Sequence, residues 1–372
     1  MRTPFFIITL SIFSILFSSC GSDKGKDLPE IDTSRTVLVY MVANNNLLAF
    51  ASDDIREMKE AAPELPADAR WLIYIDEGKN QPTLRELTRD GKWNILKTYT
   101  DNSLSVSLDR IKEVFSDTRT LAPAKNYGLI LWSHASGWLQ DGIAEPSLST
   151  LSFGDDGGKR CNITTLRAAI EPYKMEFIYG DCCNLSSVEV AYELRKCAGL
   201  FASSATRMPA DGMPYDMTLP YIAKGEIVEA AKATMKYYTE KMSTYPWCAL
   251  SVIDLSVMDR LAAETRAVYQ KSEYPVNYVP VPHEKGDNCF CFDMKHFIDA
   301  LAPGETAEWN KTLSDAVIYE DHLEYLAETK IPLKAHCGLS TFILSNSSSA
   351  GYKGYSQLEW YENVSRFQPL NN

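Results

Sequence analysis

Two short polar segments contain the residue types that nucleophilic catalysis requires. The first is SHASGW at residues 133–138, which includes His134, and the second is GDCCN at residues 180–184, which includes Cys183. A free thiol has a pKa of about 8.5, so little thiolate is present at neutral pH unless a nearby imidazole takes the proton. If the two segments lie together, His134 can act as the base for Cys183. The backbone N–H groups of Ala135 and Cys183 could then stabilise an oxyanion.

The elements that must position these segments alternate between strands and helices. Apolar runs predict buried strands at residues 37–42, 71–75, 127–132, 175–179 and 200–203, and helical spacing occurs at residues 47–61, 107–115, 163–170 and 187–196. This alternation is typical of an α/β fold with a mainly parallel sheet flanked by helices. Ligands bind such sheets at the carboxyl ends of the strands, where both polar segments begin. The helix expected after Cys183 would also favour a thiolate.

Both residues also have structural interpretations. A single histidine after a strand is more often structural than catalytic. A cysteine at a strand end is usually a small, buried, apolar residue. The spacing of His134 and Cys183 therefore does not by itself identify a catalytic pair.

Longer motifs around the two segments resemble those of the clostripain family of cysteine peptidases. That family usually has NHGSGW where this chain has SHASGW, and DAC followed by VEVAYEL where this chain has DCC and then VEVAYEL at residues 188–194. The opening TVLVYM at residues 36–41 is similar as well. The 49-residue separation of His134 and Cys183 is close to the roughly 50 residues found in caspases.

The resemblance implies a caspase-like fold and an endopeptidase that cleaves after Arg or Lys. By position, His134 is the base and Cys183 the nucleophile, whereas Cys182 occupies the family's alanine position. Asp181 matches an acid that is expected to line the substrate pocket. Hydrolysis through a thioester needs no cofactor, so no metal is expected.

Three departures from the family pattern bear on activity and specificity. Ala135 replaces a glycine, which matters only if its φ must be positive. The family's acidic ASEE run is ASSA here at residues 202–205, which leaves Asp211 as the acid of that loop and adds Arg207. These changes suggest an alternative, a catalytically inactive surface protein that binds peptides or glycans on the same fold.

The N-terminus predicts export and lipid anchoring. Arg2 precedes an apolar run at residues 5–17, and Ser18 and Ser19 lead to Cys20. This order resembles a lipoprotein signal peptide at residues 1–20, in which Cys20 becomes the lipidated terminus of the mature chain. Residues 21–34 are polar and predict a flexible tether from the membrane of the bacterial cell envelope. A signal peptide without lipid is the alternative.

The rest of the chain predicts a peptidase domain at residues 35–250 and a smaller C-terminal subdomain at residues 251–372. The formal net charge of −12 argues against nucleic acid as a partner and is compatible with a peptide substrate. Asp155 and Asp156 could bind calcium, although such a pair is more often a solvated turn. The pair Lys159-Arg160 could be a processing site or an ordinary surface pair.

Overall fold

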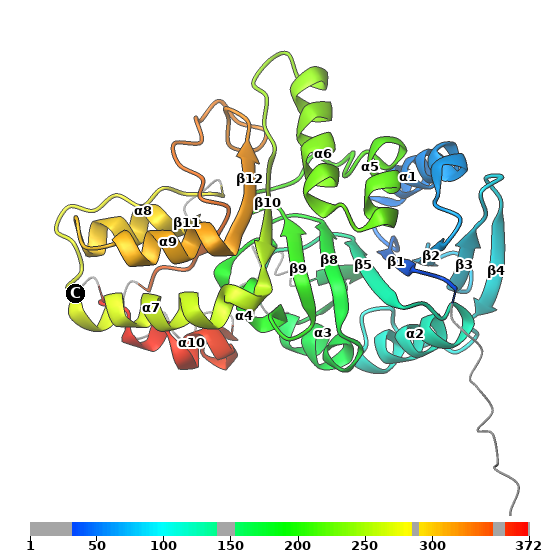
Figure 1. The fold of residues 1–372 in the computed structure, drawn as a ribbon, viewed down its shortest axis with the longest axis horizontal. Coiled ribbons are helices and arrows are strands. Elements are labelled where there is room, and N and C mark those ends of the chain that lie inside the picture. Colours follow the sequence, from blue (N-terminus) through cyan, green and yellow to red (C-terminus); the bar gives the residue numbers. More distant parts are fainter. Residues whose placement is uncertain (1–31, 140–152, 285–289, 345–353, 371–372) are drawn as a thin grey trace, which may run out of the picture. The chain divides into compact units, whose positions relative to one another are not determined.

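A nine-stranded sheet in the order β12-β10-β9-β8-β5-β1-β2-β3-β4 forms the centre of the fold (Figure 1). The computed structural model describes residues 32–139, 153–284, 290–344 and 354–370. The strands of this sheet are β1 (Arg35–Val42), β2 (Ala69–Asp76), β3 (Thr83–Leu87), β4 (Trp93–Thr98), β5 (Asn126–Trp132), β8 (Met175–Asp181), β9 (Ala198–Ser203), β10 (Ala249–Asp254) and β12 (Val317–His322).

The five middle strands, β9, β8, β5, β1 and β2, run parallel, and antiparallel strands extend the sheet at both edges. All eight residues of β1 are buried. Val37, Val39 and Met41 pack into one hydrophobic cluster, whereas Leu38, Tyr40 and Val42 pack into another. This two-sided burial is why the central strands are continuous apolar runs, and it confirms the prediction of an α/β fold with a mainly parallel sheet.

Helices cover both faces of the sheet. On one face lie α1 (Leu48–Ala61), α5 (Tyr215–Lys224) and α6 (Ile227–Lys241). The cluster on the other face includes α2 (Leu108–Leu121), α3 (Ile163–Ile170), α4 (Val188–Leu194), α7 (Met258–Lys271), α8 (Met294–Leu301), α9 (Ala307–Ala316) and α10 (Glu359–Asn363). Helices α5 and α6 are not predicted from the sequence.

The C-terminal part of the chain joins the same sheet. The boundary expected between residues 250 and 251 falls inside β10, which pairs with β9 on one side and β12 on the other. Residues 32–372 form one compact unit. Two small sheets stand apart from the large one, β6 (Phe153–Asp156) with β7 (Lys159–Cys161) and β11 (Phe292–Asp293) with β13 (Ser340–Thr341).

The N-terminal predictions concern residues that the structure does not describe. Cys20, the signal peptide and most of the tether lie outside the described ranges. Among the helices that are described, none has the length and apolar character to span a bilayer. Among the described residues, Cys161, Cys182, Cys183, Cys197, Cys248 and Cys337 are free thiols.

Candidate active site

The sheet register brings the histidine and cysteine segments to the same edge. Strands β5 and β8 pair in parallel, and their last matched residues are Trp132 and Asp181. His134 and Cys183 each lie two residues beyond that pair, on neighbouring strands about 4.8 Å apart. The two loops also touch: at Gly137, with a φ of +71°, an added Cβ would lie 2.8 Å from the backbone oxygen of Asn184. The backbone therefore supplies the proximity that a catalytic pair requires.

His134 is oriented by a residue from a third strand end. Its Nε2 lies 2.6 Å from Oδ1 of Asn46, which follows β1. Because an amide oxygen only accepts hydrogen bonds, Nε2 carries the proton and Nδ1 is left as the basic nitrogen. Burial lowers the pKa of His134, an effect that Asp155 opposes and Arg160 reinforces. The imidazole is consequently neutral at neutral pH, as a general base must be.

The histidine loop is fixed through its own backbone. The backbone oxygen of His134 accepts a hydrogen bond from Gly154 N at 2.9 Å, and Ala135 pairs with Phe153 as an isolated bridge. Ala135 is not among the described residues with positive φ, so its side chain brings no strain of that kind. Replacement of the family's glycine at this position is thus compatible with the loop conformation.

Cys183 holds a thiol rather than a thiolate in the free protein. Its Sγ accepts a long hydrogen bond from Met208 N at 3.4 Å, and the side chain is half-buried. Burial raises the pKa of the thiol, whereas the Met208 N–H and Arg207 act to lower it. The proton therefore remains on sulfur until a base removes it.

The expectation that a helix N-terminus activates Cys183 is wrong. Helix α4 begins at Val188, and its N-cap is Ser187, whose Oγ accepts from Val190 N. Three residues separate Cys183 from that cap, and the field of a helix terminus falls off within about one turn. His134 is the remaining candidate for the base.

Cys182 points to the opposite face of the sheet. Its thiol donates to the backbone oxygen of Leu131 at 3.6 Å, and only 3% of the residue is exposed. It belongs to the hydrophobic cluster that contains α2, α3 and α4, whereas Cys183 packs against the cluster on the other face. Alternation along the strand thus separates the two thiols, and only Cys183 lies where solvent and substrate can reach it.

Asp181 is buried beneath the loop that follows β9. Its two oxygens accept hydrogen bonds from Met213 N and from the hydroxyl of Tyr215, each at 3.0 Å. At Gly212, with a φ of +61°, an added Cβ would lie 2.9 Å from the carboxylate. Burial raises the pKa of Asp181, and it raises that of the nearby Asp54 even more strongly. Asp181 therefore shapes the loop that carries Asp211.

Asp211 lies on the same loop but is already paired. Its Oδ2 accepts from Lys241 Nζ at 2.7 Å, and nearly half of its side chain is exposed. Arg207 does not neutralise it, because Arg207 Nε instead donates to Glu284 Oε1 at 3.1 Å. Glu284 also accepts from Asn184 Nδ2 at 2.7 Å, directly beside Cys183.

Sequence reasoning missed three residues of this site: Asn46, Lys241 and Glu284. Asn46 could have been predicted, because it follows a central strand and the carboxyl ends of parallel strands lie at the same edge of a sheet. Lys241 and Glu284 had none, because they come from α6 and from a loop far along the chain.

Protein donors contact the other acidic residues that were singled out from the sequence. Asp155 pairs with Arg160 at 2.9 Å, and Asp156 accepts from Asn44 Nδ2 and Ser105 N, so protein donors engage both acids of the suggested calcium site. Arg160 lies in β7 with its side chain mostly buried, and the suggested processing site there stays a prediction.

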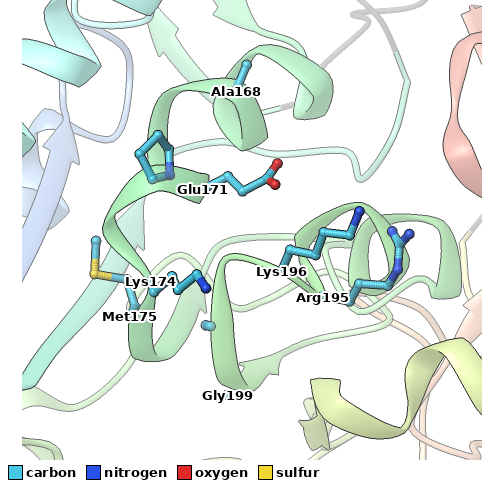
Figure 2. A pocket seen from close by; sticks show the side chains of 9 residues that line it. Ala168, Glu171, Lys174, Met175, Arg195, Lys196 and Gly199 are labelled. Atoms are coloured by element: carbon cyan, nitrogen blue, oxygen red, sulfur yellow. The ribbon is translucent and has the colours of Figure 1, made fainter.

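A pocket of about 730 Å³ lies elsewhere on the molecule (Figure 2). Met175 and Ala198, the first residues of β8 and β9, line it together with Lys174 and Lys196. It is thus at the amino ends of these strands, opposite the edge that carries His134 and Cys183. This pocket is separate from the candidate catalytic pair.

Known proteins resemble this chain over most of its length. The profile of the clostripain family matches residues 39–350. A secreted C11 cysteine protease from Bacteroides thetaiotaomicron, solved in complex with an irreversible peptide inhibitor, is 30% identical with a TM-score of 0.77, and the match covers 89% of this chain and 98% of that one. An inactive zymogen C11 protease from Parabacteroides distasonis is 27% identical with a TM-score of 0.78, over 89% and 98% of the two chains. No curated protein gives a significant match. The likeness confirms the caspase-like fold that the motifs implied.

Proposed function

The chain belongs to the clostripain family and is a cysteine peptidase, and we propose that it is an endopeptidase acting through a dyad of Cys183 and His134. The observation that carries this assignment is the parallel register of β5 and β8, which ends at Trp132 and Asp181 and sets both residues two positions further on. A solved relative was trapped with an irreversible peptide inhibitor, which supports a peptide as the substrate class.

The geometry supports a two-step reaction. Nδ1 of His134 takes the thiol proton as Sγ of Cys183 attacks the scissile carbonyl carbon, and the resulting oxyanion is held by backbone N–H groups such as those of Ala135 and Cys183. The imidazolium then gives its proton to the leaving amine as the C–N bond breaks. Water, deprotonated by the same imidazole, hydrolyses the thioester and restores the thiol.

We further propose that cleavage follows a basic residue, Arg before Lys. Asp211 precedes Gly212, which packs against the carboxylate of Asp181, and Asp181 is the last residue of the strand that Cys183 follows. A substrate guanidinium can replace Lys241 as the partner of Asp211, since an exposed ion pair contributes only about 0–1 kcal/mol. The planar fork of Arg can bind a carboxylate with two hydrogen bonds, which Lys cannot.

A peptide library that varies the residue before the scissile bond tests both proposals. Peptides with Arg should be cleaved fastest, and Asp211→Asn should lower kcat/KM for them by about tenfold or more, while neutral peptides change little. Lys241→Met frees Asp211 and should raise kcat/KM for Arg peptides by about two- to fivefold. Equal cleavage of apolar or acidic peptides would refute the pocket. A protein that leaves every peptide intact would instead be a binding protein.

We also propose that the protein is exported and anchored by lipid at Cys20. Two features support this: the signal-like order of residues 1–20 and a relative that is described as secreted. Mass spectrometry of the N-terminal peptide from native membranes should find a diacylglyceryl-modified Cys20 as the first residue. Cys20→Ser should then release the protein from the membrane fraction. A mature chain that begins at another residue without lipid would contradict the anchor.

A further inference from the structure

A cluster of imidazoles and a carboxylate lies at the edge of the sheet, outside the catalytic machinery. Glu320 and His322 are on the edge strand β12, and His336 lies in the segment that leads to β13. From these three side chains we infer a binding site for a divalent transition-metal ion of the zinc type. The inference does not depend on the proposed dyad.

The distances suit tetrahedral coordination. Glu320 Oε2 lies 3.1 Å from Nδ1 of His336 and 3.8 Å from Nδ1 of His322. Zinc bonds of about 2.0–2.2 Å to nitrogen and oxygen place neighbouring ligand atoms about 3.3–3.5 Å apart. The two distances lie on either side of that value. All three ligand atoms lie within 4.8 Å of one another, so a modest rotation of the side chains would close the site.

The burial of the three residues leaves room for that adjustment. The His336 side chain is fully buried, which fixes one ligand. Side-chain exposures of 41% for Glu320 and 35% for His322 let the other two move and leave a fourth position for water. Two imidazoles and one carboxylate favour zinc over calcium or magnesium, which prefer all-oxygen sites.

The surroundings of His336 add a second observation. Its ring lies 5.5 Å from that of the buried His283, measured between centroids. Within the described ranges, Nε2 of His336 and Nδ1 of His283 are buried without a hydrogen-bond partner. Two of the five histidines of the chain thus lie beside Glu320, although they come from separate segments, whereas Nε2 of His283 lies 3.6 Å from Asp293 Oδ2. Two imidazoles and a carboxylate brought together from two segments are a donor set that suits a zinc-type cation.

Metal binding can be measured on the full chain carrying Cys183→Ala, which removes the catalytic thiol as a competing ligand. Calorimetric titration with Zn²⁺ should give one site, and the thermal midpoint should rise with Zn²⁺ because only the folded state presents the three ligands together. Glu320→Gln and His322→Ala, both at partly exposed positions, should each weaken Zn²⁺ binding at least about tenfold. His296→Ala is the matched control, because His296 bonds to the Tyr278 hydroxyl elsewhere, and should leave binding unchanged.

Co²⁺ supplies an independent readout. It should give the intense visible bands of tetrahedral coordination without a thiolate charge-transfer band, because no cysteine belongs to the cluster. The proposal would be overturned if Zn²⁺ failed to bind, if Glu320→Gln and His322→Ala bound it as tightly as the parent, or if a thiolate band showed that cysteines hold the metal.

Discussion

Replacing Cys183 with alanine is expected to lower kcat/KM for peptide hydrolysis by about four to six orders of magnitude, the scale seen when a catalytic nucleophile is removed. The adjacent thiol cannot take its place. Cys182 is turned into the opposite hydrophobic cluster, where its thiol donates to the backbone oxygen of Leu131. The loss should appear as a fall in kcat, with folding and peptide binding preserved.

The matched control is Cys182→Ala. Removing a buried sulfur should cost about 1 kcal/mol of unfolding free energy and leave kcat within about threefold of the parent. Steady-state kinetics on a cleavable peptide, with thermal melts of both variants, separates loss of chemistry from loss of fold. A peptide with a thiol-reactive group should label the parent at Cys183. Near-normal turnover by Cys183→Ala, or loss of turnover only in Cys182→Ala, would contradict the assignment.

The central sheet could be predicted from the sequence because its strands are buried on both faces. In β1, β5 and β8 that burial produces continuous apolar runs. The polar segments that follow β5 and β8 then indicate the edge of the sheet at which the candidate site lies. The edge strand β12 could not be recognised in the same way. Its sequence, VIYEDH, is only partly buried and has no continuous apolar run.

The side-chain partners around the site depend on tertiary contacts that local pattern does not encode. Asp211 was predicted as a pocket acid, but its ion pair with Lys241 depends on how α6 packs beside the loop. Arg207, on the same loop as Asp211, pairs with Glu284 from a distant segment. The start of α4, by contrast, is a local feature: the segment predicted at residues 187–196 begins at Val188 behind its Ser187 cap.

His134→Ala is expected to lower kcat by about two to four orders of magnitude, the usual contribution of a general base. The pH profile distinguishes a base from a structural residue. Because burial lowers the pKa of His134, the acid limb of kcat/KM in the parent should lie below the ordinary histidine value of about 6.5. In His134→Ala that limb should vanish. The residual rate should instead rise with pH towards the raised pKa of the Cys183 thiol.

Asn46 should act on the reaction through His134. Asn46→Ala removes the acceptor for Nε2–H, which also stabilises the imidazolium, and a hydrogen bond to a charged group contributes about 1.5–3 kcal/mol. We therefore expect kcat to fall by about 10- to 100-fold with little change in KM. Asn46→Asp keeps an acceptor oxygen and adds a negative charge that favours the imidazolium. It should retain much of the activity and move the acid limb to higher pH.

Asn44→Ala is the control for the Asn46 variants, because Asn44 Nδ2 donates to Asp156 rather than to the imidazole. It should lower stability without moving the acid limb. If Asn46→Asp left the acid limb in place, Asn46 would not be hydrogen-bonded to the titrating imidazole during turnover. The tautomer of His134 is assigned from that hydrogen bond. The assignment of Nδ1 as the basic nitrogen would then be wrong.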